Sequence, residues 1–332
     1  MVLNIKYVIS NEYNPYDNLA MEEYLLNRVE KNECILYLWQ NERTVVIGKN
    51  QNPWKECKIN ALEEDHGTLV RRLSGGGAVF HDLGNLNFTF LVNQEDYDVE
   101  KQLEVIIKAV RGLGIPAEKT GRNDITVDGR KFSGNAFYSN GTHCYHHGTI
   151  LVNVDMQNLS KYLNVSRDKL ISKGVESVKS RVINLNEYVT GLDIQKMKQE
   201  LIKAFAEVYA CDPIQMDFAD IDYTELNKLC IKFSSWDWIF GKKNEFNYSI
   251  GNRFEWENIE IQLNIDSGII KQCTVYSDAM DTKLIEGIPN ILMNCLFSTD
   301  VMVKALEGLA GKDQALDKMI NDIVKMLMEE GI

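Results

Sequence analysis

A lysine that follows a predicted tight turn is the residue of this sequence best placed to do chemistry. Lys131 comes two residues after Asp128-Gly129 in the stretch TGRNDITVDGRKFSGNAFY. On a strand its side chain would share a face with Ser133, while Phe132 would point the other way. A hairpin lysine usually faces solvent, but here Asn123-Asp124 precede the turn and two glycines nearby leave the approach open. We expect Lys131 to neutralise charge in a site, provided that its face meets the rest of that site.

A run of three glycines is the second unusual feature. Gly75 to Gly77 follow the pair Arg71-Arg72 and precede His81-Asp82 in RRLSGGGAVFHDLGN. Each glycine loses more chain entropy on folding than any other residue, so three in a row indicate a need for bare backbone. The dinucleotide motif would require a glycine at Phe80, and no lysine follows as in a P-loop. Guanidinium groups beside exposed N–H groups favour an anion-binding loop, although arginine pairs are also common on solvated surface.

The stretch THCYHHGTIL contains three of the five histidines. On a strand, His143, Tyr145 and His147 would share one face, and Cys144 and His146 the other. At most two ligands then face one point, so a zinc site is not expected. A nucleophilic role for Cys144 would need a base within hydrogen-bond reach, which one strand cannot supply. A histidine here could equally form a structural hydrogen bond across the sheet.

The composition is that of a water-soluble globular protein. The chain has 332 residues, of which 45% are hydrophobic and 25% charged, with a net charge of −12. This charge argues against nonspecific nucleic-acid binding, which needs a basic surface. Seven scattered cysteines without a C-x-x-C pair favour a reducing compartment. Neither a targeting segment nor an apolar run of 18 residues is apparent, so we expect a cytoplasmic protein with no membrane contact.

Hydrophobic periodicity and turn signals predict an α+β protein with a large mixed sheet. Asp128-Gly129 and Asn140-Gly141 are both expected to form type I′ hairpin turns, and the polar segment QNER a further hairpin. The expected strands of this part are Ile5 to Ile9, Ile35 to Trp39, Thr44 to Ile47, Thr68 to Arg72 and Leu86 to Val92, and the expected helices are Pro15 to Glu30, Val99 to Leu113 and Asp193 to Ala210.

A second, smaller α+β domain is expected after a boundary near Gly241 to Gly251, which gives domains of residues 1–245 and 246–332. Strand-like alternation resumes at Phe254 to Ile265, and two strands are expected before the helices. Those helices are expected near Thr282 to Phe297, Thr299 to Ala310 and Asp313 to Glu329.

Five motifs in a fixed order resemble those of the lipoate–protein ligases in the biotin/lipoate ligase superfamily. They are RRLSGGGAVFHDLGNLNFTF, GRNDI, RKFSGNAFY, HHGTILVNVD and SKGVESVKSRVINL, and SSWDWIFGKKNEF resembles the end of that family's large domain. The resemblance implies a large catalytic domain with a small accessory domain. It also implies that lipoate and MgATP give lipoyl-AMP, from which the lipoyl group passes to a specific lysine of an acceptor domain.

The resemblance also implies the roles of individual residues. Lys131 would be the catalytic lysine, contacting the lipoyl carbonyl and the α-phosphate, and Asp124 would lie near the magnesium ion. Lys173 to Arg181 would form the adenylate-binding loop. The implied substrate and ATP-binding residues are Arg72, Ser74, Gly75, Gly76, Gly77, Ala78, Val79, Phe80, Asn85, Asn123, Asp124, Lys131, His147 and Gly148.

The family implies acceptors of two kinds, the lipoyl domains of 2-oxoacid dehydrogenase complexes and the glycine-cleavage H protein. ATP and Mg²⁺ would act with lipoate as substrates, without a permanently bound cofactor, and a monomer is expected. The alternatives are an ATP-independent octanoyl or lipoyl transferase that uses a cysteine thioester, and a non-catalytic lipoate-binding module. Biotin is a less favoured substrate, because that branch has a different arginine-glycine pattern at this loop.

Overall fold

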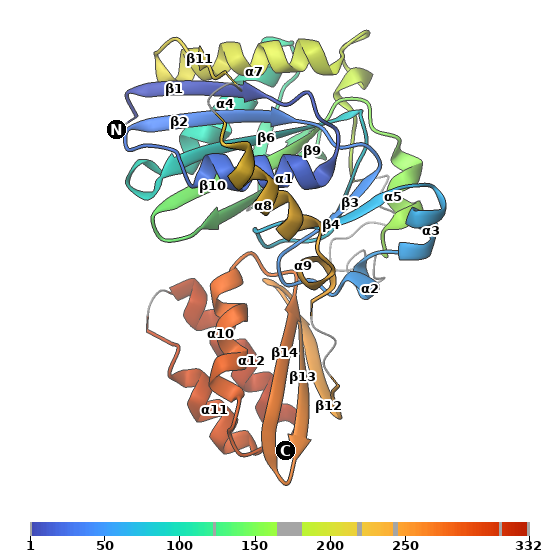
Figure 1. Ribbon diagram of the computed structural model, residues 1–332, viewed down its shortest axis with the longest axis vertical. Coiled ribbons are helices and arrows are strands. Elements are labelled where there is room, and N and C mark those ends of the chain that lie inside the picture. Colours follow the sequence, from blue (N-terminus) through green and yellow to red (C-terminus); the bar gives the residue numbers. More distant parts are fainter. Residues whose placement is uncertain are drawn as a thin grey trace. The chain divides into compact units, whose positions relative to one another are not determined.

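A computed structural model of the chain describes residues 2–121, 124–164, 181–217, 221–241, 245–311 and 314–330. Asn123 and residues 173–180 of the expected adenylate loop lie outside these ranges, so their roles stay predictions. By contacts between residues the described chain forms two compact units, each with helices and strands (Figure 1). The α+β class predicted from the sequence is therefore confirmed.

The units are interleaved along the chain. The larger one comprises Met1–Ile47, Trp54–Arg72 and Ala78–Ile239. The smaller one comprises Gly48–Pro53, Leu73–Gly77 and Phe240–Ile332. The glycine run thus groups with the C-terminal part of the chain, although the strands on either side of it belong to the larger unit.

The larger unit is built on an eight-stranded mixed sheet in the order β11-β1-β2-β6-β10-β9-β8-β7. Strands β11, β1 and β2 run parallel, and β2, β6, β10, β9, β8 and β7 pair in antiparallel fashion. The strands are β1 (Asn4–Ile9), β2 (Glu33–Trp39), β6 (Asn85–Asn93), β7 (Glu118–Thr120), β8 (Asp124–Val127), β9 (Arg130–Ser139), β10 (His143–Leu151) and β11 (Ile214–Gln215).

A separate three-stranded sheet corrects one prediction. β3 (Thr44–Ile47) pairs in parallel with β4 (Thr68–Arg71) and antiparallel with β5 (Val79–His81), so β2 and β3 do not form a hairpin. The polar segment between them was expected to form the turn of that hairpin. Instead Gln40 and Asn41 are buried where the chain passes from one sheet to the other.

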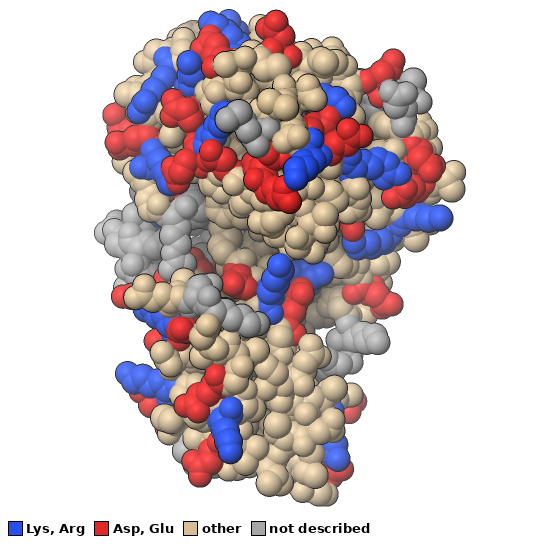
Figure 2. Space-filling view, turned by 90° about the vertical axis from the view of Figure 1, so that its left-hand side faces the viewer, with Lys and Arg blue, Asp and Glu red and all other residues tan. Residues whose placement is uncertain are grey.

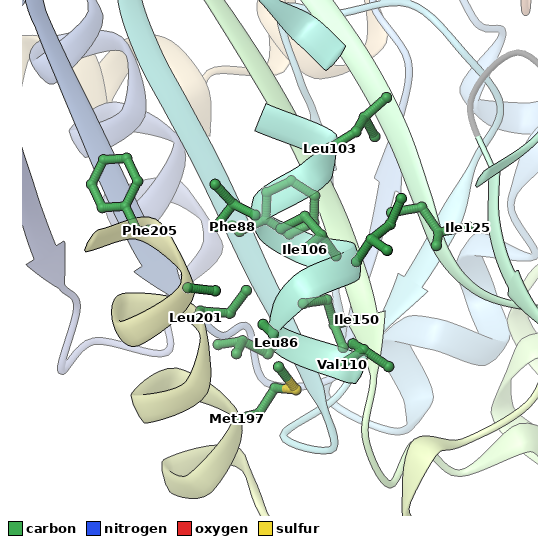
Figure 3. Packing of buried hydrophobic residues seen from close by; sticks show 14 of the residues in the cluster. Leu86, Phe88, Leu103, Ile106, Val110, Ile125, Ile150, Met197, Leu201 and Phe205 are labelled. Carbon is green, nitrogen blue, oxygen red and sulfur yellow. The ribbon is translucent and has the colours of Figure 1, made fainter. Parts of the chain in front are cut away.

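One face of the large sheet is covered by α4 (Val99–Gly112) and α7 (Ile194–Tyr209). Both helices begin at a capping aspartate, Asp98 or Asp193, whose side chain accepts a backbone N–H three residues on. Their apolar stripes meet the sheet in a continuous core, as periodicity predicted (Figure 3). Figure 3 labels Leu103, Ile106 and Val110 of α4, Met197, Leu201 and Phe205 of α7, and Leu86, Phe88, Ile125 and Ile150 of the sheet.

The opposite face of the sheet is covered by α1 (Pro15–Leu26), which also packs against α8 (Tyr223–Ser234). α1 begins as predicted, with the Asn14 side chain accepting from Tyr16 N and proline at the first helical position. It ends at Leu26 rather than near Glu30. Because two layers pack against it, α1 is buried over most of its circumference and even includes a buried glutamate, Glu22.

The two predicted hairpin turns differ. Asp128 and Gly129 have φ of 49° and 74°, which confirms the expected conformation at both positions. In the second turn only Gly141 has a positive φ, of 99°, and Asn140 N donates to His143 O. Gly141 and Thr142 therefore form the loop, as in a type II′ turn. Asn140 precedes it and accepts from Thr142 N and His143 N.

The smaller unit combines a three-stranded antiparallel sheet with helices (Figure 1). Its strands are β12 (Tyr248–Phe254), β13 (Glu257–Asp266) and β14 (Ile269–Ser277). The sequence predicted two strands before the helices, and the structure has three. The helices α10 (Thr282–Leu292), α11 (Thr299–Glu307) and α12 (Gln314–Glu330) lie close to the predicted ranges, and a second apolar core joins them to the sheet.

The remaining described elements are short. They are α2 (Pro53–Glu56), α3 (Ile59–Glu64), α5 (Met156–Tyr162), α9 (Trp236–Phe240) and the 3₁₀ turns Gln94–Asp96 and Leu185–Glu187. Among the described residues, no helix has the length and hydropathy needed to span a bilayer. On the face shown in Figure 2, acidic and basic side chains are interspersed, without a continuous basic stripe among the described residues.

Candidate active site

A β-bulge sets the direction of Lys131. Thr126 pairs with Lys131, but its neighbour Ile125 pairs with Ser133, so Phe132 is an extra residue in β9. Phe132 and Ser133 are both fully buried, which corrects the strict alternation predicted for this strand. The extra residue moves Lys131 onto the same face as Gly134, since their separation of three would otherwise place them on opposite faces.

Lys131 is held at both its backbone and its side chain. Its N–H donates to Arg181 O at 2.8 Å, and its carbonyl accepts from Ile183 N at 3.0 Å. Its ammonium lies 2.6 Å from Asp124 Oδ1, and both side chains are about a quarter to a third exposed. A Cβ on Gly134 would lie 2.7 Å from Lys131 Nζ, so a larger residue at this position would move the end of the lysine side chain. The site therefore presents an ordered, accessible cation and carboxylate.

Buried polar groups continue across the same face of the sheet. Glu22 of α1 accepts from Thr89 Oγ1 at 2.7 Å, and His147 Nδ1 lies 2.8 Å from the same carboxylate oxygen. Because a carboxylate accepts, Nδ1 of His147 carries a hydrogen. Trp39 Nε1 donates to Thr89 Oγ1 at 3.1 Å. The chain Trp39–Thr89–Glu22 links β2 and β6 to the helix, with His147 joining from β10.

Arg72 and Arg71 have different environments. Arg72 is buried and donates to Val46 O at 3.2 Å. Burial lowers the pKa of its guanidinium to about 10, and the nearby Tyr145 and Glu22 oppose that shift. Arg71 instead donates to the carbonyls of Trp238 and Ile239, at 2.9 Å and 3.0 Å from Nε. Arg71 thus caps the end of α9, and only Arg72 lies near the buried polar groups.

The glycine run lies against the protein's own backbone. A Cβ on Gly75 would lie 2.3 Å from Ala279 O and 2.9 Å from Met280 Cα, and Gly76 N donates to Ala279 O at 3.4 Å. Gly76 has a φ of 87°, and a Cβ on Gly48 would lie 2.1 Å from its carbonyl oxygen. Packing therefore explains the missing side chains of Gly48 and Gly75. A role of this loop against a ligand stays a prediction.

The other predicted residues of the stretch Ser74 to Phe80 divide between loop and strand. Ser74 is fully buried and Lys49 N donates to its carbonyl at 2.9 Å. Val79 and Phe80 belong to β5, and the ring of Phe80 packs on Tyr162 at 5.2 Å between centroids. Gly77 and Ala78 connect the two parts.

Two further predicted residues lie on the sheet. Asn85 is fully buried at the start of β6 and donates to Asn87 Oδ1 at 2.9 Å. Gly148 pairs with Phe88, and a Cβ there would lie 2.7 Å from the Phe88 ring and 2.5 Å from Gly134 O. Its missing side chain is explained by packing on the α4 face, next to the strand that holds Lys131.

The histidine stretch alternates as predicted. His147 faces α1, whereas Cys144 and His146 are fully buried on the face covered by α4 and α7. His146 Nε2 lies 2.8 Å from Asn135 Oδ1, and Cys144 Sγ lies 2.9 Å from Gln94 Oε1. Cys144 and His147 are therefore separated by the sheet.

Glu22 is the main residue of this cluster that sequence reasoning missed. Its helix was predicted, but no function was assigned to an acidic residue within it. The available signal was the apolar surroundings of Glu22 in NLAMEEYLL, where an acidic residue on a buried helix face needs a partner. The partners, Thr89 and His147, are distant in sequence and could not be named beforehand.

Two protein-family models match this chain. A model described as the lipoyl protein ligase A/B catalytic domain matches residues 14–206, and one described as the bacterial lipoate protein ligase C-terminus matches residues 243–327. The chain belongs to the lipoate–protein ligase family. The lipoate-protein ligase A of Psychrobacter cryohalolentis is 39% identical over 326 residues, which cover 96% of each chain.

Solved lipoate–protein ligases share the fold. LipL1 of P. falciparum, in complex with lipoate, matches with a TM-score of 0.84 and 32% identity over 97% of this chain and 100% of that one. A bi-partite lipoate protein ligase of Thermoplasma acidophilum, described with its E2 lipoyl domain, matches with a TM-score of 0.66 and 26% identity. The match covers 73% of this chain and 99% of that one. A lipoate-protein ligase A bound with ATP matches with a TM-score of 0.63 and 25% identity, over 73% of this chain and 99% of that one.

Proposed function

We propose that this member of the family activates lipoate with ATP and transfers the lipoyl group to a specific lysine of lipoyl-acceptor domains. The observation that carries the proposal is the placement of Lys131. Its ammonium is held beside Asp124 at 2.6 Å, on the sheet face that also carries the buried group around Glu22. A fixed cation next to a sheltered face is suited to an acid that is charged at one end and apolar along its length.

The first step would form a mixed anhydride. A carboxylate oxygen of lipoate attacks the α-phosphorus of ATP, the bond to the bridging oxygen breaks, and pyrophosphate leaves with the electron pair. Negative charge grows on the α-phosphate oxygens, where the Lys131 ammonium would lie. A preorganised donor aimed at such charge typically contributes about 3 to 4 kcal/mol of transition-state stabilisation.

The second step would use the same cation. The acceptor lysine, as a neutral amine, attacks the acyl carbon of lipoyl-AMP; AMP leaves and the amine nitrogen releases a proton. Charge now grows on the acyl oxygen, next to the phosphate that Lys131 already contacts. One ammonium can therefore serve both steps, because both reacting centres share the anhydride.

Asp124 fits a magnesium ion that arrives with ATP. Mg²⁺ prefers oxygen ligands, and in nucleotide sites it is usually held by one or two carboxylates together with phosphates and water. The Lys131 ammonium lies against Oδ1 of Asp124, and the carboxylate of Asp124 would help to hold the ion. The ion would supply charge neutralisation on the phosphates.

The proposal is tested by replacing Lys131 with alanine. Lipoate-dependent exchange of labelled pyrophosphate into ATP should fall at least a hundredfold, which corresponds to losing one such donor. Lys119→Ala is a matched control, because Lys119 lies on β7, two strands from β9 in the same sheet, and its ammonium pairs with Glu100. Exchange that persists in the Lys131 variant, or is absent from the wild type, would overturn the proposal.

The transferase alternative depends on a reactive cysteine. Cys144, the cysteine nearest the motifs, is fully buried in the core opposite His147. Burial raises the pKa of Cys57 to about 12, which disfavours its thiolate. Acceptor lipoylation measured by mass spectrometry separates the two mechanisms when the acyl group is supplied either as free lipoate with ATP or as a lipoyl thioester without ATP. The cysteine of a transferase takes the acyl group from the supplied thioester, whose thiol leaves, so only a transferase modifies the acceptor in the second case.

The acceptors are proposed to be lipoyl domains of 2-oxoacid dehydrogenase complexes or the glycine-cleavage H protein. Support comes from the Thermoplasma acidophilum relative, which is described with its E2 lipoyl domain. A monomeric state and a cytoplasmic location stay predictions. Mass spectrometry of a lipoyl domain and an H protein after incubation with the protein, lipoate and ATP would identify the preferred acceptor.

A further inference from the structure

A buried histidine next to the proposed acyl site has an environment that dictates its tautomer. His81 ends β5 and is 3% exposed. Its ring meets the edge of Trp39, with 6.2 Å between ring centroids. Trp39 pairs across the sheet with Asn87, which in turn pairs with Thr149. His81, Trp39 and Asn87 therefore lie in one cluster on the α1 side of the sheet.

A chain of buried amides fixes which atom faces His81. Asn18 Nδ2 donates to two backbone carbonyls, Gln40 O at 2.8 Å and Glu12 O at 3.1 Å. Since carbonyls only accept, the orientation of the Asn18 amide is determined. The same nitrogen lies 3.0 Å from Asn41 Oδ1, so its two hydrogens are shared among three acceptors. Because an amide nitrogen does not accept, the Asn41 atom that faces it is the oxygen. The other end of the Asn41 amide, its Nδ2, then lies 3.3 Å from His81 Nδ1 and must donate to it.

His81 consequently carries its hydrogen on Nε2. Burial, with the charges of Arg72 and His147, lowers the pKa of His81 to about 3, so the ring is neutral at physiological pH. A neutral imidazole has one hydrogen, and Nδ1 is already an acceptor. The Nε2–H group has no partner among the described residues and is shielded from solvent.

Asn87 and Asn85 add two more unsatisfied atoms to this cluster. Asn85 Nδ2 donates to Asn87 Oδ1, which leaves Asn87 Nδ2 and Asn85 Oδ1 buried and without partners in the described chain. A buried polar atom without a partner destabilises the state in which it lies, because it has lost its hydrogen bonds to water. Buried donors of this kind favour a ligand that brings an acceptor and disfavour one that leaves them unpaired.

The distance between Lys131 and this cluster suits an acyl chain whose carboxylate end lies at Lys131 and whose far end lies at the cluster. Lys131 is on β9 and Trp39 on β2, three strands away in the sheet. At about 4.8 Å per strand this is about 14 Å, comparable with an extended eight-carbon chain that ends in a ring. Gly134 N donates to Thr149 Oγ1 at 3.3 Å, and Thr149 pairs with Asn87, so one row of residues joins the two ends.

We propose that Asn18 and Asn41 are positioning residues that hold His81 as its Nε2–H tautomer, so that His81 and Asn87 select acyl chains with an acceptor atom at this depth. The inference rests on the proposed function for the identity of the substrate. A dithiolane sulfur is a weak acceptor and satisfies the donors, whereas a saturated chain of the same length leaves them unpaired. The chain is therefore specialised for lipoate over octanoate by hydrogen bonding as well as by shape.

The selectivity test compares two acids in the same assay. The ratio of kcat/KM for lipoate over octanoate, measured by acid-dependent pyrophosphate exchange, should fall about fivefold in His81→Leu, which removes the donor. His81→Gln can place an amide N–H near the position of Nε2 and should retain most of the ratio. His143→Leu, at the far end of β10, is the matched control and should leave it unchanged. An unchanged ratio in His81→Leu would mean that a buried water satisfies the donors, and would overturn the proposal.

The tautomer is tested without any activity. Side-chain ¹⁵N NMR of the wild type should show the Nε2–H form of His81, assigned by its disappearance in His81→Gln. In Asn41→Asp the new carboxylate only accepts, so the hydrogen should move to Nδ1 and the lipoate preference should drop as in His81→Leu. A wild-type Nδ1–H form would refute the positioning role even if the enzyme is active. Absence of pyrophosphate exchange with either acid would instead refute the proposed function. It would not affect the tautomer of His81 that NMR reports.

Discussion

One buried carboxylate organises the polar interior of the larger unit. Glu22 is 1% exposed, accepts from Thr89, faces Nδ1 of His147 and lies near the buried guanidinium of Arg72. An intact buried group of charges contributes little to the net free energy of unfolding. Removing one member is nevertheless strongly destabilising, because the remaining charges are left buried without compensation. Glu22 therefore supplies the negative charge of this buried group, to which Thr89 and His147 are hydrogen-bonded.

Replacing Glu22 with glutamine should lower the free energy of unfolding by about 3 kcal/mol, because the buried group then loses the negative charge that Glu22 supplies. Urea unfolding at neutral pH measures the change. Glu95→Gln is the control, since Glu95 forms a surface pair with Lys31 in which both side chains are more than 60% exposed, and it should change stability by less than about 1 kcal/mol. Equal effects of the two substitutions would contradict the role given to Glu22.

Two buried threonines offer opposite outcomes for the same substitution. The hydroxyl of Thr126 has no partner among the described residues, whereas that of Thr89 accepts from Trp39 and donates to Glu22. Valine has nearly the same shape as threonine. Thr126→Val should stabilise the protein by about 1 kcal/mol, and Thr89→Val should destabilise it by about 1 to 3 kcal/mol. Thermal unfolding of both variants gives the comparison, and a shared sign would contradict it.

At the scale of elements, hydrophobic periodicity predicted the helices whose bounds depend on local sequence. The helices α4 and α7 have separate apolar and polar faces and capping aspartates, and both were predicted nearly to the residue. The sheet to which β3 belongs was not predictable, because its partners β4 and β5 lie more than 20 residues away and strand pairing depends on tertiary packing. The candidate site was only partly predictable for the same reason: Lys131 and Asp124 are close in sequence, whereas Glu22 and Thr89 are not.

The bulge in β9 has a consequence for Gly134. A methyl group at this position would lie 2.7 Å from Lys131 Nζ, so Gly134→Ala should displace the ammonium. Lipoate-dependent pyrophosphate exchange should fall about tenfold or more, while the fold is retained. Gly287→Ala in helix α10 is the matched control, because a Cβ there meets nothing within 4 Å. It should leave exchange unchanged and stabilise the protein by about 0.5 to 1 kcal/mol.

Strand β10 places His146 in the aromatic core, where it stacks with Phe90 and contacts Phe137. Burial lowers its pKa to about 3. The unfolded chain takes up a proton near pH 6.5 and the folded chain does not, so this residue makes stability fall as the pH decreases from about 6.5 towards 3.

His146→Phe should remove that contribution. At pH 5 a single buried neutral histidine costs about 2 kcal/mol relative to pH 7, and the variant should lose correspondingly less stability over this interval. Urea unfolding at pH 5, 6 and 7 measures the slope for both proteins. His143→Phe, at the partly exposed start of the same strand, should keep the wild-type slope. Identical slopes for wild type and His146→Phe would show that His146 does not contribute.

At the scale of the whole molecule, the chain order and the division into units do not coincide. The C-terminal residues 240–332 form a unit together with two short segments, 48–53 and 73–77, that the sequence places far upstream. Within this unit Ser277 N donates to Asn50 O at 2.9 Å, and Lys49 Nζ lies 3.7 Å from Glu286. The glycine run thus packs within the smaller unit, against residues 279–280. No motif in the run could have indicated this contact.

Gly75 gives this arrangement a direct test. A Cβ at this residue would lie 2.3 Å from Ala279 O and 2.9 Å from Met280 Cα, so Gly75→Ala must push the glycine run away from the 279–280 backbone. Overpacking of this kind typically costs about 1 to 3 kcal/mol, which a lower thermal midpoint would report. Because Lys131 and Asp124 belong to the other unit, a parallel loss of pyrophosphate exchange would mean that catalysis requires the run to stay on residues 279–280. Gly287→Ala lies in the same unit and should raise the midpoint. A Gly75 variant with unchanged stability and exchange would show that the contact matters to neither folding nor catalysis.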